Sequence, residues 1–367
     1  MRIIESLVAT GSRLLLAALS VLLTLVALEA GLRVFAPLLD RHLFPVLTGW
    51  KEADFLTVFA FDEAFGKELL RPVERFHHVD ERGEYDYEIT TTECHGFYVR
   101  PPCVRGRDVV FHFGDSFGFG YGAKDDETFV ALLDRSGPYR HVNFGIAGDN
   151  LLAEIDQARV LIERLPVAEQ PRILYFHAFL GNDIRGSLRY LRQDEEPGSP
   201  ASALAGRIAQ AIKQSKLRVL VKNRLEAARL RWKNGKLPEG VNFSTKDLRE
   251  IERMDSGYLA RVDQVAAESA GRMARLRAVY SGTVVVTLIP PKEIYLLRDD
   301  TRSYQRRRDA FASALRPYGV VVLDMLGAVS AEEVLPLYFK IDTHFNARGR
   351  EWFAQFLRSQ PPLSNPG

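Results

Sequence analysis

The stretch VVFHFGDS, residues 109–116, joins a short apolar run to a turn of glycine, aspartate and serine. Such a run followed by small turn residues is typical of a buried strand. Four more apolar runs follow at residues 142–144, 173–176, 284–289 and 320–323. Helical patterns lie near residues 127–133, 151–165, 258–280, 304–315 and 347–357. Strands that alternate with helices predict an α/β fold with a parallel five-stranded sheet covered on both faces.

Residues whose side chains could take part in catalysis follow several of these runs. Ser116 follows the first run, a turn containing Gly148 follows the second, and Asn182 follows the third. Asp342 and His344 come after the fifth. Because ligands of open parallel sheets bind beyond the carboxyl ends of the strands, we expect these residues to lie along one edge.

Each residue type has a role in acyl transfer. Ser116 is a candidate nucleophile, His344 a candidate base, and Asp342 a carboxylate that can orient the imidazole. In an extended segment the side chains of Asp342 and His344 project to the same face. The N–H groups of Ser116 and Gly148 and the Asn182 amide are candidate donors of an oxyanion hole. Separately, each residue also fits an ordinary structural role, such as a turn or a helix cap.

The motifs together resemble the SGNH (GDSL-type) hydrolase superfamily. Gly-Asp-Ser at residues 114–116, the Gly148 turn, Gly-Asn-Asp at 181–183 and the late Asp/His pair follow the order of its four blocks. The match covers residues 108 to about 357, apart from an insertion. The resemblance implies a three-layer flavodoxin-like fold, a triad of Ser116, His344 and Asp342, and Ser116, Gly148 and Asn182 as oxyanion donors. We expect no cofactor, and no Cys/His spacing supports a metal site.

One departure from the family pattern affects the expected substrate. The commoner pattern has an acid three residues before the histidine, where this chain has Ile341. The Asp-x-His spacing and the run IPPKEIY, residues 289–295, look more like a branch that includes membrane-associated polysaccharide O-acetylation proteins. The resemblance therefore implies an esterase or O-acyltransferase that acts on acyl, chiefly acetyl, esters of a polysaccharide. A membrane acyl-donor protein is a further partner for a transferase.

Other functions remain open at this stage. A lipid esterase or thioesterase of the same fold would use the same triad, and a non-catalytic glycan-binding or assembly protein would keep the fold alone. Residues 118–123 also match G-x-G-x-x-A, a dinucleotide-binding pattern. Lys292 is expected either to be solvated or to touch an acidic substrate, and His77 and His78 are expected in a surface loop.

The amino-terminal region predicts a membrane anchor. Leu14 to Leu28 carries no charge, and a span of sufficient length would cover residues 14–36. Residues 1–13 would form a cytoplasmic tip, and the catalytic domain would be periplasmic, tied to the inner membrane by a single pass. A cleaved signal peptide is the main alternative, although Leu28 occupies a position where cleavage favours a small residue. A buried core helix is a second alternative.

The remaining organisation follows from the spacing of the patterns. Residues 37–107 are expected to form a linker with accessory strands, and residues 108–360 the catalytic domain, with a helical insertion at about 195–255. The segment 207–236 has ten basic residues and one acidic residue, a local charge of +9. It suits a membrane surface, an acidic glycan or a solvated helical face. We expect no nucleic-acid partner for an exported domain.

Composition excludes several classes of protein. The chain has 367 residues, of which 26% are charged and 46% hydrophobic, and its net charge is +2. These values exclude a disordered or collagen-like chain. The mean hydropathy of -0.12 excludes a mostly membrane-embedded protein. Cys94 and Cys103 are the only cysteines. They would form a disulfide in an exported domain, or remain two thiols in a cytosolic one.

Overall fold

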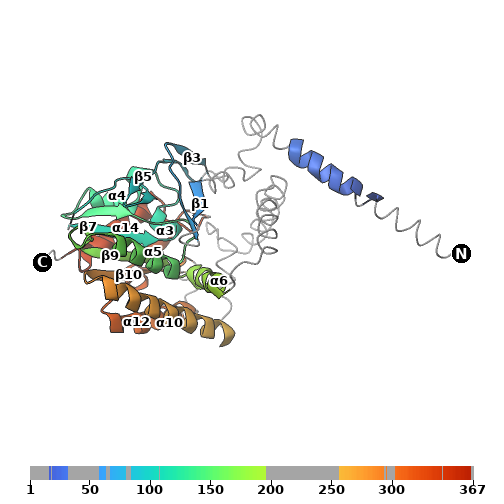
Figure 1. The fold of residues 1–367 in the computed structure, drawn as a ribbon. Helices are drawn as coiled ribbons and strands as arrows, with labels where there is room; N and C mark the ends of the chain where they lie inside the picture. The colour runs from blue at the N-terminus through green and yellow to red at the C-terminus, as the bar shows by residue number, and fades with distance from the viewer. Residues whose placement is uncertain are drawn as a thin grey trace. The chain divides into compact units, whose positions relative to one another are not determined.

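The computed structural model describes residues 16–17, 19–31, 58–62, 67–79, 84–106, 108–195, 256–292, 295, 302–340 and 342–364. The chain divides into two compact units, and the larger unit comprises Phe55–Pro197 and Trp232–Gly367 (Figure 1). The predicted insertion at about 195–255 and the basic segment 207–236 lie almost wholly outside the described residues.

A five-stranded parallel sheet forms the centre of this unit. Its order is β11-β10-β9-β7-β8, which is the 2-1-3-4-5 order of flavodoxin-like folds. The strands are β7 (Val109–Gly114), β8 (Arg140–Asn143), β9 (Ile173–Phe179), β10 (Thr283–Ile289) and β11 (Val321–Asp324). The five strands predicted from the apolar runs are confirmed, with boundaries shifted by up to three residues. The order reverses between β7 and β9, the position where such folds bind ligands.

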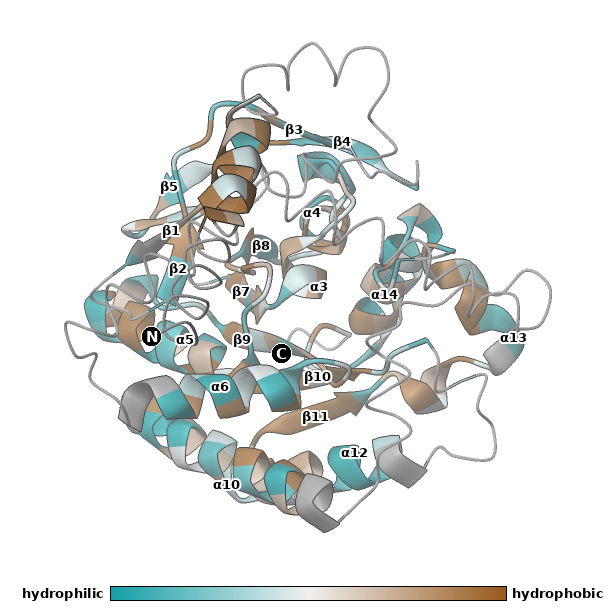
Figure 2. Cartoon of the chain, turned by 90° about the vertical axis from the view of Figure 1, so that its right-hand side faces the viewer, coloured by the Kyte–Doolittle hydropathy of each residue, from teal (hydrophilic) through white to brown (hydrophobic). Residues whose placement is uncertain are grey.

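Alternate side chains of the strands enter two different cores. Phe111, Phe176 and Val286 pack with α5 and α10 on one face, while Val110, Tyr175 and Val285 pack with α4 and α14 on the other (Figures 1 and 2). The main helices are α4 (Phe129–Asp134), α5 (Leu151–Arg164), α6 (Asp183–Glu195), α10 (Ser256–Val279), α12 (Arg302–Leu315) and α14 (Ala347–Ser359). The predicted three-layer arrangement is confirmed.

Polar residues fix where several of these helices begin. The Asn150 side chain accepts from the Ala153 N–H and caps α5, and the Asn346 side chain accepts from the Gly349 N–H and caps α14. The sequence did not predict α6. Its segment contains Gly186 and is rich in charged residues, although Ile184, Leu188 and Leu191 recur at helical spacing and could have revealed it.

The region predicted as a linker contains accessory strands that pack on the α/β core. Its strands pair as three antiparallel hairpins. They are β1 (Phe59–Asp62) with β2 (Lys67–Leu70), β3 (Phe76–Val79) with β4 (Asp86–Ile89), and β5 (Thr92–Cys94) with β6 (Phe97–Val99). Tyr85 and Tyr87 share a core with Phe119 and Ile146. The surface-loop prediction is wrong, because His77 and His78 both lie in β3. His77 is at the surface and pairs with Asp86, whereas His78 is 2% exposed and packs edge-on against Tyr87. His78 is buried because it lies directly opposite Tyr87 in the β3–β4 pair.

The two cysteines are joined. Cys94, at the end of β5, forms a disulfide with Cys103, and Cys94 is fully buried in the larger core. The alternative of two thiols is therefore wrong for this structure. The bond ties the β5–β6 hairpin to the segment that leads into β7.

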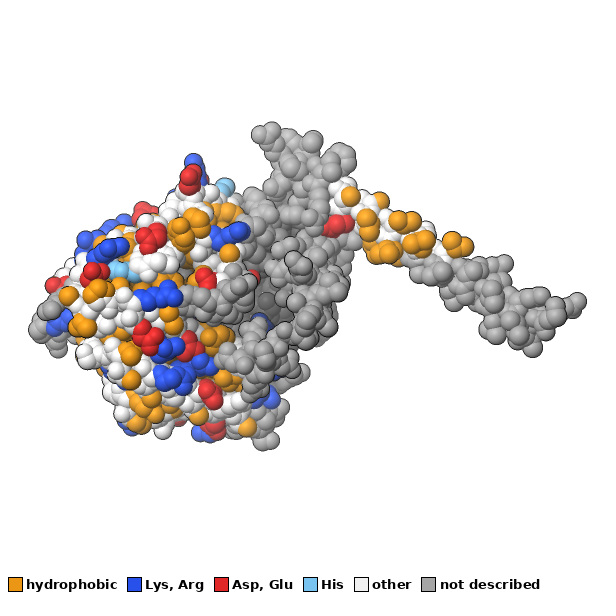
Figure 3. Space-filling model, viewed as in Figure 1, with side chains coloured by type: hydrophobic (Ala, Val, Ile, Leu, Met, Phe, Trp, Pro, Cys, Tyr) orange, Lys and Arg blue, Asp and Glu red, His pale blue; other side chains and the backbone are white. Residues whose placement is uncertain are grey.

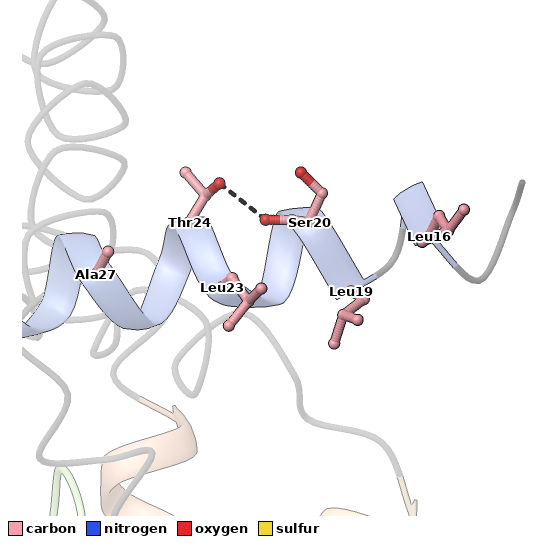
Figure 4. Close-up of a pocket in the computed structure, with 6 residues that line it drawn as sticks. All are labelled: Leu16, Leu19, Ser20, Leu23, Thr24 and Ala27. Atoms are coloured by element: carbon pink, nitrogen blue, oxygen red, sulfur yellow. Dashed lines mark hydrogen bonds between the residues drawn. The ribbon is translucent and has the colours of Figure 1, made fainter.

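The other unit contributes one described helix, residues 16–17 and 19–31. Its leucine and valine side chains are exposed, and they appear as the orange surface of the helix in Figure 3. A shallow recess on one side of this helix is lined by Leu16, Leu19, Ser20, Leu23, Thr24 and Ala27, and the Thr24 hydroxyl donates to the Ser20 carbonyl at 2.8 Å (Figure 4). Among the described residues, no helix is both long enough and apolar enough to cross a membrane. Residues 14–15, 18 and 32–36 of the predicted anchor lie outside the described residues.

A row of three buried histidines, His112, His141 and His177, crosses β7, β8 and β9. His112 bonds to His177 at 2.9 Å and to His141 at 2.8 Å. Burial lowers the pKa of His141 from 6.5 to about 4 and that of His177 from 6.5 to about 3. The folded row therefore excludes protons that the unfolded chain binds.

This histidine row predicts acid sensitivity. Its contribution to stability is complete above the unfolded pKa of about 6.5 and is lost as the pH falls toward the folded values. We expect about 2 kcal/mol of destabilisation for each of His141 and His177 between pH 7 and pH 5, measured by urea unfolding. The variant His141→Gln, which has one proton fewer to bind, should show a smaller decrease. Equal decreases in the variant and the wild type would contradict the prediction.

Candidate active site

Ser116 begins a short helix directly after β7. This helix, α3 (Ser116–Phe119), is capped by Asp115, whose Oδ1 accepts from the Phe117 N–H at 2.9 Å. The turn lies against the segment after β8 so closely that a Cβ on Gly145 would lie 2.3 Å from the Phe119 backbone nitrogen. The helical turn thus presents Ser116, which is half-buried, at the carboxyl edge of the sheet.

Three of the predicted residues form one hydrogen-bonded chain. The Ser116 Oγ donates to His344 Nε2 at 2.6 Å, and His344 Nδ1 donates to Asp342 Oδ1 at 2.5 Å. The donor at Nδ1 follows from its partner, because a carboxylate only accepts. The side chains of Asp342 and His344 are each 13% exposed. This is the arrangement of an activated nucleophile, a base and an orienting acid.

Asn182 lies beside this chain. Its Nδ2 donates to Asp115 Oδ2 at 3.3 Å, and the same oxygen is 3.5 Å from Ser116 Oγ. An amide nitrogen has two protons, so the second can serve an anion that forms at Ser116. Gly148 lies in an exposed turn with a φ of 89°. Within the described residues no hydrogen bond joins Gly148 to Ser116 or Asn182, so its role as a donor stays a prediction.

Acidic groups surround the carboxyl edge near Asp115. Burial, above all, raises the pKa of Asp115 to about 6. Burial also raises the pKa values of Glu154 and Asp183, whose carboxyl oxygens have no hydrogen-bond partner among the described residues. Lys67 from β2 pairs with Asp149 at 2.6 Å and supports the Gly148 turn. Sequence reasoning did not single out Lys67, because its partner is 82 positions away.

Two buried arginines donate hydrogen bonds to backbone carbonyls of the loops around the site. Arg100 donates to the Phe119 and Gly120 carbonyls, both at 3.0 Å, and to the Ala123 carbonyl at 2.7 Å. Arg350 donates to the carbonyl of Phe345, the residue after His344, at 2.9 Å. Neither arginine was predicted to matter.

The structure corrects the expectations for Lys292. This side chain is 2% exposed, so it is buried and not solvated. Its Nζ donates to the backbone carbonyls of Phe339, Lys340 and Asp342 at 2.9, 3.2 and 2.7 Å. Lys292 follows β10 at the same edge of the sheet and reaches the segment that contains the acid.

The arrangement bears on the other candidate ligands. The dinucleotide pattern at 118–123 does not open a helix, because Gly120 ends α3 with a φ of 81°. A dinucleotide fingerprint requires a helix that starts there. Within the described ranges, no group of three or more histidine, cysteine, aspartate or glutamate side chains is placed to hold a metal ion.

Comparisons with known proteins give remote similarities only. Neither a family model nor a curated protein sequence matches the chain. A lipolytic protein of the G-D-S-L family from Veillonella parvula shares 14% identity over 70% of this chain and 99% of its own, with a TM-score of 0.39. A salicylyl-acyltransferase from a tetracycline biosynthetic pathway shares 16% identity over 70% of this chain and 54% of its own, also with a TM-score of 0.39. A carbohydrate esterase family 2 enzyme from Corynascus thermopiles shares 11% identity over 71% of this chain and 67% of its own, with a TM-score of 0.37. At these TM-scores the similarities do not indicate a function for this chain.

The position of Asn182 predicts a rate effect. If its amide stabilises an oxyanion, Asn182→Ala should lower kcat for 4-nitrophenyl acetate by about 100 to 1000-fold and leave KM nearly unchanged. Arg189→Ala, on the exposed side of α6, is the matched control and should retain full activity. An Asn182→Ala variant as active as this control would exclude the role.

Proposed function

We propose that this chain is a serine ester hydrolase or O-acyltransferase of the SGNH type. The observation that carries the proposal is the continuous chain from Ser116 Oγ through His344 to Asp342. It lies at the carboxyl edge of the sheet, where the order of the strands reverses. The Ser116 hydroxyl is bonded to the base, which favours catalysis over a purely binding role.

The geometry supports a two-step acyl transfer. Ser116 Oγ attacks the acyl carbonyl while its proton passes to His344 Nε2, and Asp342 stabilises the imidazolium that forms. The oxyanion accepts from the Asn182 amide, the Ser116 N–H and the Gly148 N–H. The tetrahedral intermediate then expels the alcohol, which takes the proton from His344, and leaves an acyl-serine. Water or a sugar hydroxyl releases the acyl group, which distinguishes an esterase from a transferase.

The substrate that we propose is an acyl ester, chiefly an acetyl ester, of a polysaccharide. The Asp-x-His spacing and residues 289–295 support it through their resemblance to the polysaccharide O-acetylation branch. We also propose a single-pass anchor at residues 14–36 in the inner membrane and a periplasmic catalytic domain. The disulfide between Cys94 and Cys103 supports an oxidising compartment. A membrane protein that supplies the acyl group would complete a transferase.

The decisive test uses the full chain in detergent with 4-nitrophenyl acetate and an acetylated oligosaccharide. Ser116→Ala and His344→Ala should each lose at least about 1000-fold in kcat, because they remove the nucleophile and its base. Glu88→Ala, on β4, where the glutamate side chain is 42% exposed and pairs with Arg75, is the control for the variants. Full activity in Ser116→Ala would overturn the proposed function.

The same assay separates the alternative substrates. Faster turnover of long-chain esters or acyl thioesters than of acetyl esters would favour a lipid esterase or thioesterase. Transfer of the acetyl group to an added oligosaccharide would identify a transferase. Binding of the glycan without any turnover would indicate a glycan-binding protein.

A further inference from the structure

Because only one residue separates Asp342 from His344, the backbone conformation at Asp342 sets the direction of its carboxylate. The same carboxylate oxygen accepts from the ring Nδ1 of His344 and from its backbone N–H at 2.9 Å. One intervening residue, Thr343, leaves little chain with which to adjust the carboxylate. The direction of the acid therefore depends on the peptide groups on either side of Asp342.

Two charged side chains hold those peptide groups. The Asp342 N–H donates to Glu84 Oε2 at 2.7 Å, and the Asp342 carbonyl accepts from Lys292 Nζ at 2.7 Å. Lys292 also donates to Phe339 and Lys340, so the three donors of its ammonium group meet three carbonyls of one segment. Hydrogen bonds with one charged partner are about twice as strong as neutral ones.

Glu84 belongs to the accessory region and not to the sheet that carries the triad. It lies two residues before β4 (Asp86–Ile89), next to Tyr85, whose ring packs on Phe339 with centroids 5.1 Å apart. Tyr121 lies between this region and the base, with ring centroids 5.5 Å from Tyr85 and 4.7 Å from His344. The accessory region thus packs on the segment that carries Asp342 and also bonds to it.

We infer that Glu84 and Lys292 are positioning residues that together aim the Asp342 carboxylate at His344. The inference rests on the proposed function. Glu84 fixes the amino side of Asp342 and Lys292 fixes the carbonyl side, so the peptide planes cannot turn without breaking a charge-assisted bond. Loss of either side frees the carboxylate, and the imidazolium of the reaction loses its partner.

Kinetics of the full chain in detergent test this inference. Glu84→Ala removes the acceptor, Glu84→Gln retains an acceptor oxygen without the charge, and Lys292→Met removes the three donors. The matched control is Glu88→Ala, on the same hairpin, where the glutamate is exposed and pairs with Arg75. Titration of Ser116 with a fluorophosphonate gives the concentration of active sites, so that kcat refers to folded enzyme only.

We expect Glu84→Ala and Lys292→Met to lower kcat by about 10 to 100-fold with KM within about threefold of the wild type. Glu84→Gln should recover most of kcat. A carboxylate that faces an imidazole raises the pKa of the imidazole. If Asp342 no longer points at His344 in Glu84→Ala, the acid limb of the kcat/KM profile should move to lower pH. Asp115 and Tyr121, which also face His344, are the same in all variants.

The results distinguish positioning from a general effect on folding. If Glu84→Ala matches Glu88→Ala in kcat, or loses kcat with an unchanged pH profile and no rescue in Glu84→Gln, the inference is overturned. Should Lys292→Met fail to fold, the two Glu84 variants still decide. An inactive Ser116→Ala beside a fully active Glu84→Ala would overturn this inference alone, whereas an active Ser116→Ala would overturn the proposed function.

Discussion

Buried cations bonded to backbone carbonyls hold the loops on which the site depends. Arg100, Lys292 and Arg350 are at most 4% exposed, and each donates to several carbonyls of irregular segments. Irregular segments lack the regular backbone hydrogen bonds of helices and strands. A buried carbonyl without a hydrogen bond lowers the stability of the fold by about 1–3 kcal/mol. These side chains supply the missing donors, so segments outside the sheet and the helices have fixed positions.

The choice of carbonyls as partners has an electrostatic consequence. A buried cation is costly unless it is well solvated by the protein, and several oriented carbonyl dipoles replace part of its water. Burial lowers the pKa of Arg350 to about 10, so this arginine stays charged at neutral pH. Arg100 adds an ion pair with Asp125 at 2.8 Å. Groups whose pKa values lie closer to or below neutral pH lie elsewhere, in the histidine row and at Asp115.

The accessory hairpins take part in the site through these contacts. Arg100, directly after β6, holds the loop after Ser116, Lys67 of β2 supports the Gly148 turn through Asp149, and Glu84 bonds to Asp342. The loop after Ser116, the Gly148 turn and the Asp342 segment are thus each bonded to a side chain from the accessory region, residues 58–106. Asp115 and Asp342 give the blocks some support of their own, and the accessory region supplies further hydrogen bonds that position their loops.

The sequence by itself determined the alternation of strands and helices and the placement of Ser116, Asn182, Asp342 and His344 after the strands. Apolar periodicity and turn residues are local signals, and parallel strands bring their carboxyl ends together in any such sheet. The helix α6 was missed because charged residues dominate its segment, although its apolar residues recur at helical spacing. No sequence signal indicated the burial of His78. Only the tertiary structure decided which cations hold which loops and how Asp342 is aimed. The physical reason is that the partners are backbone N–H and carbonyl groups, which nearly every residue carries and which no sequence pattern can mark.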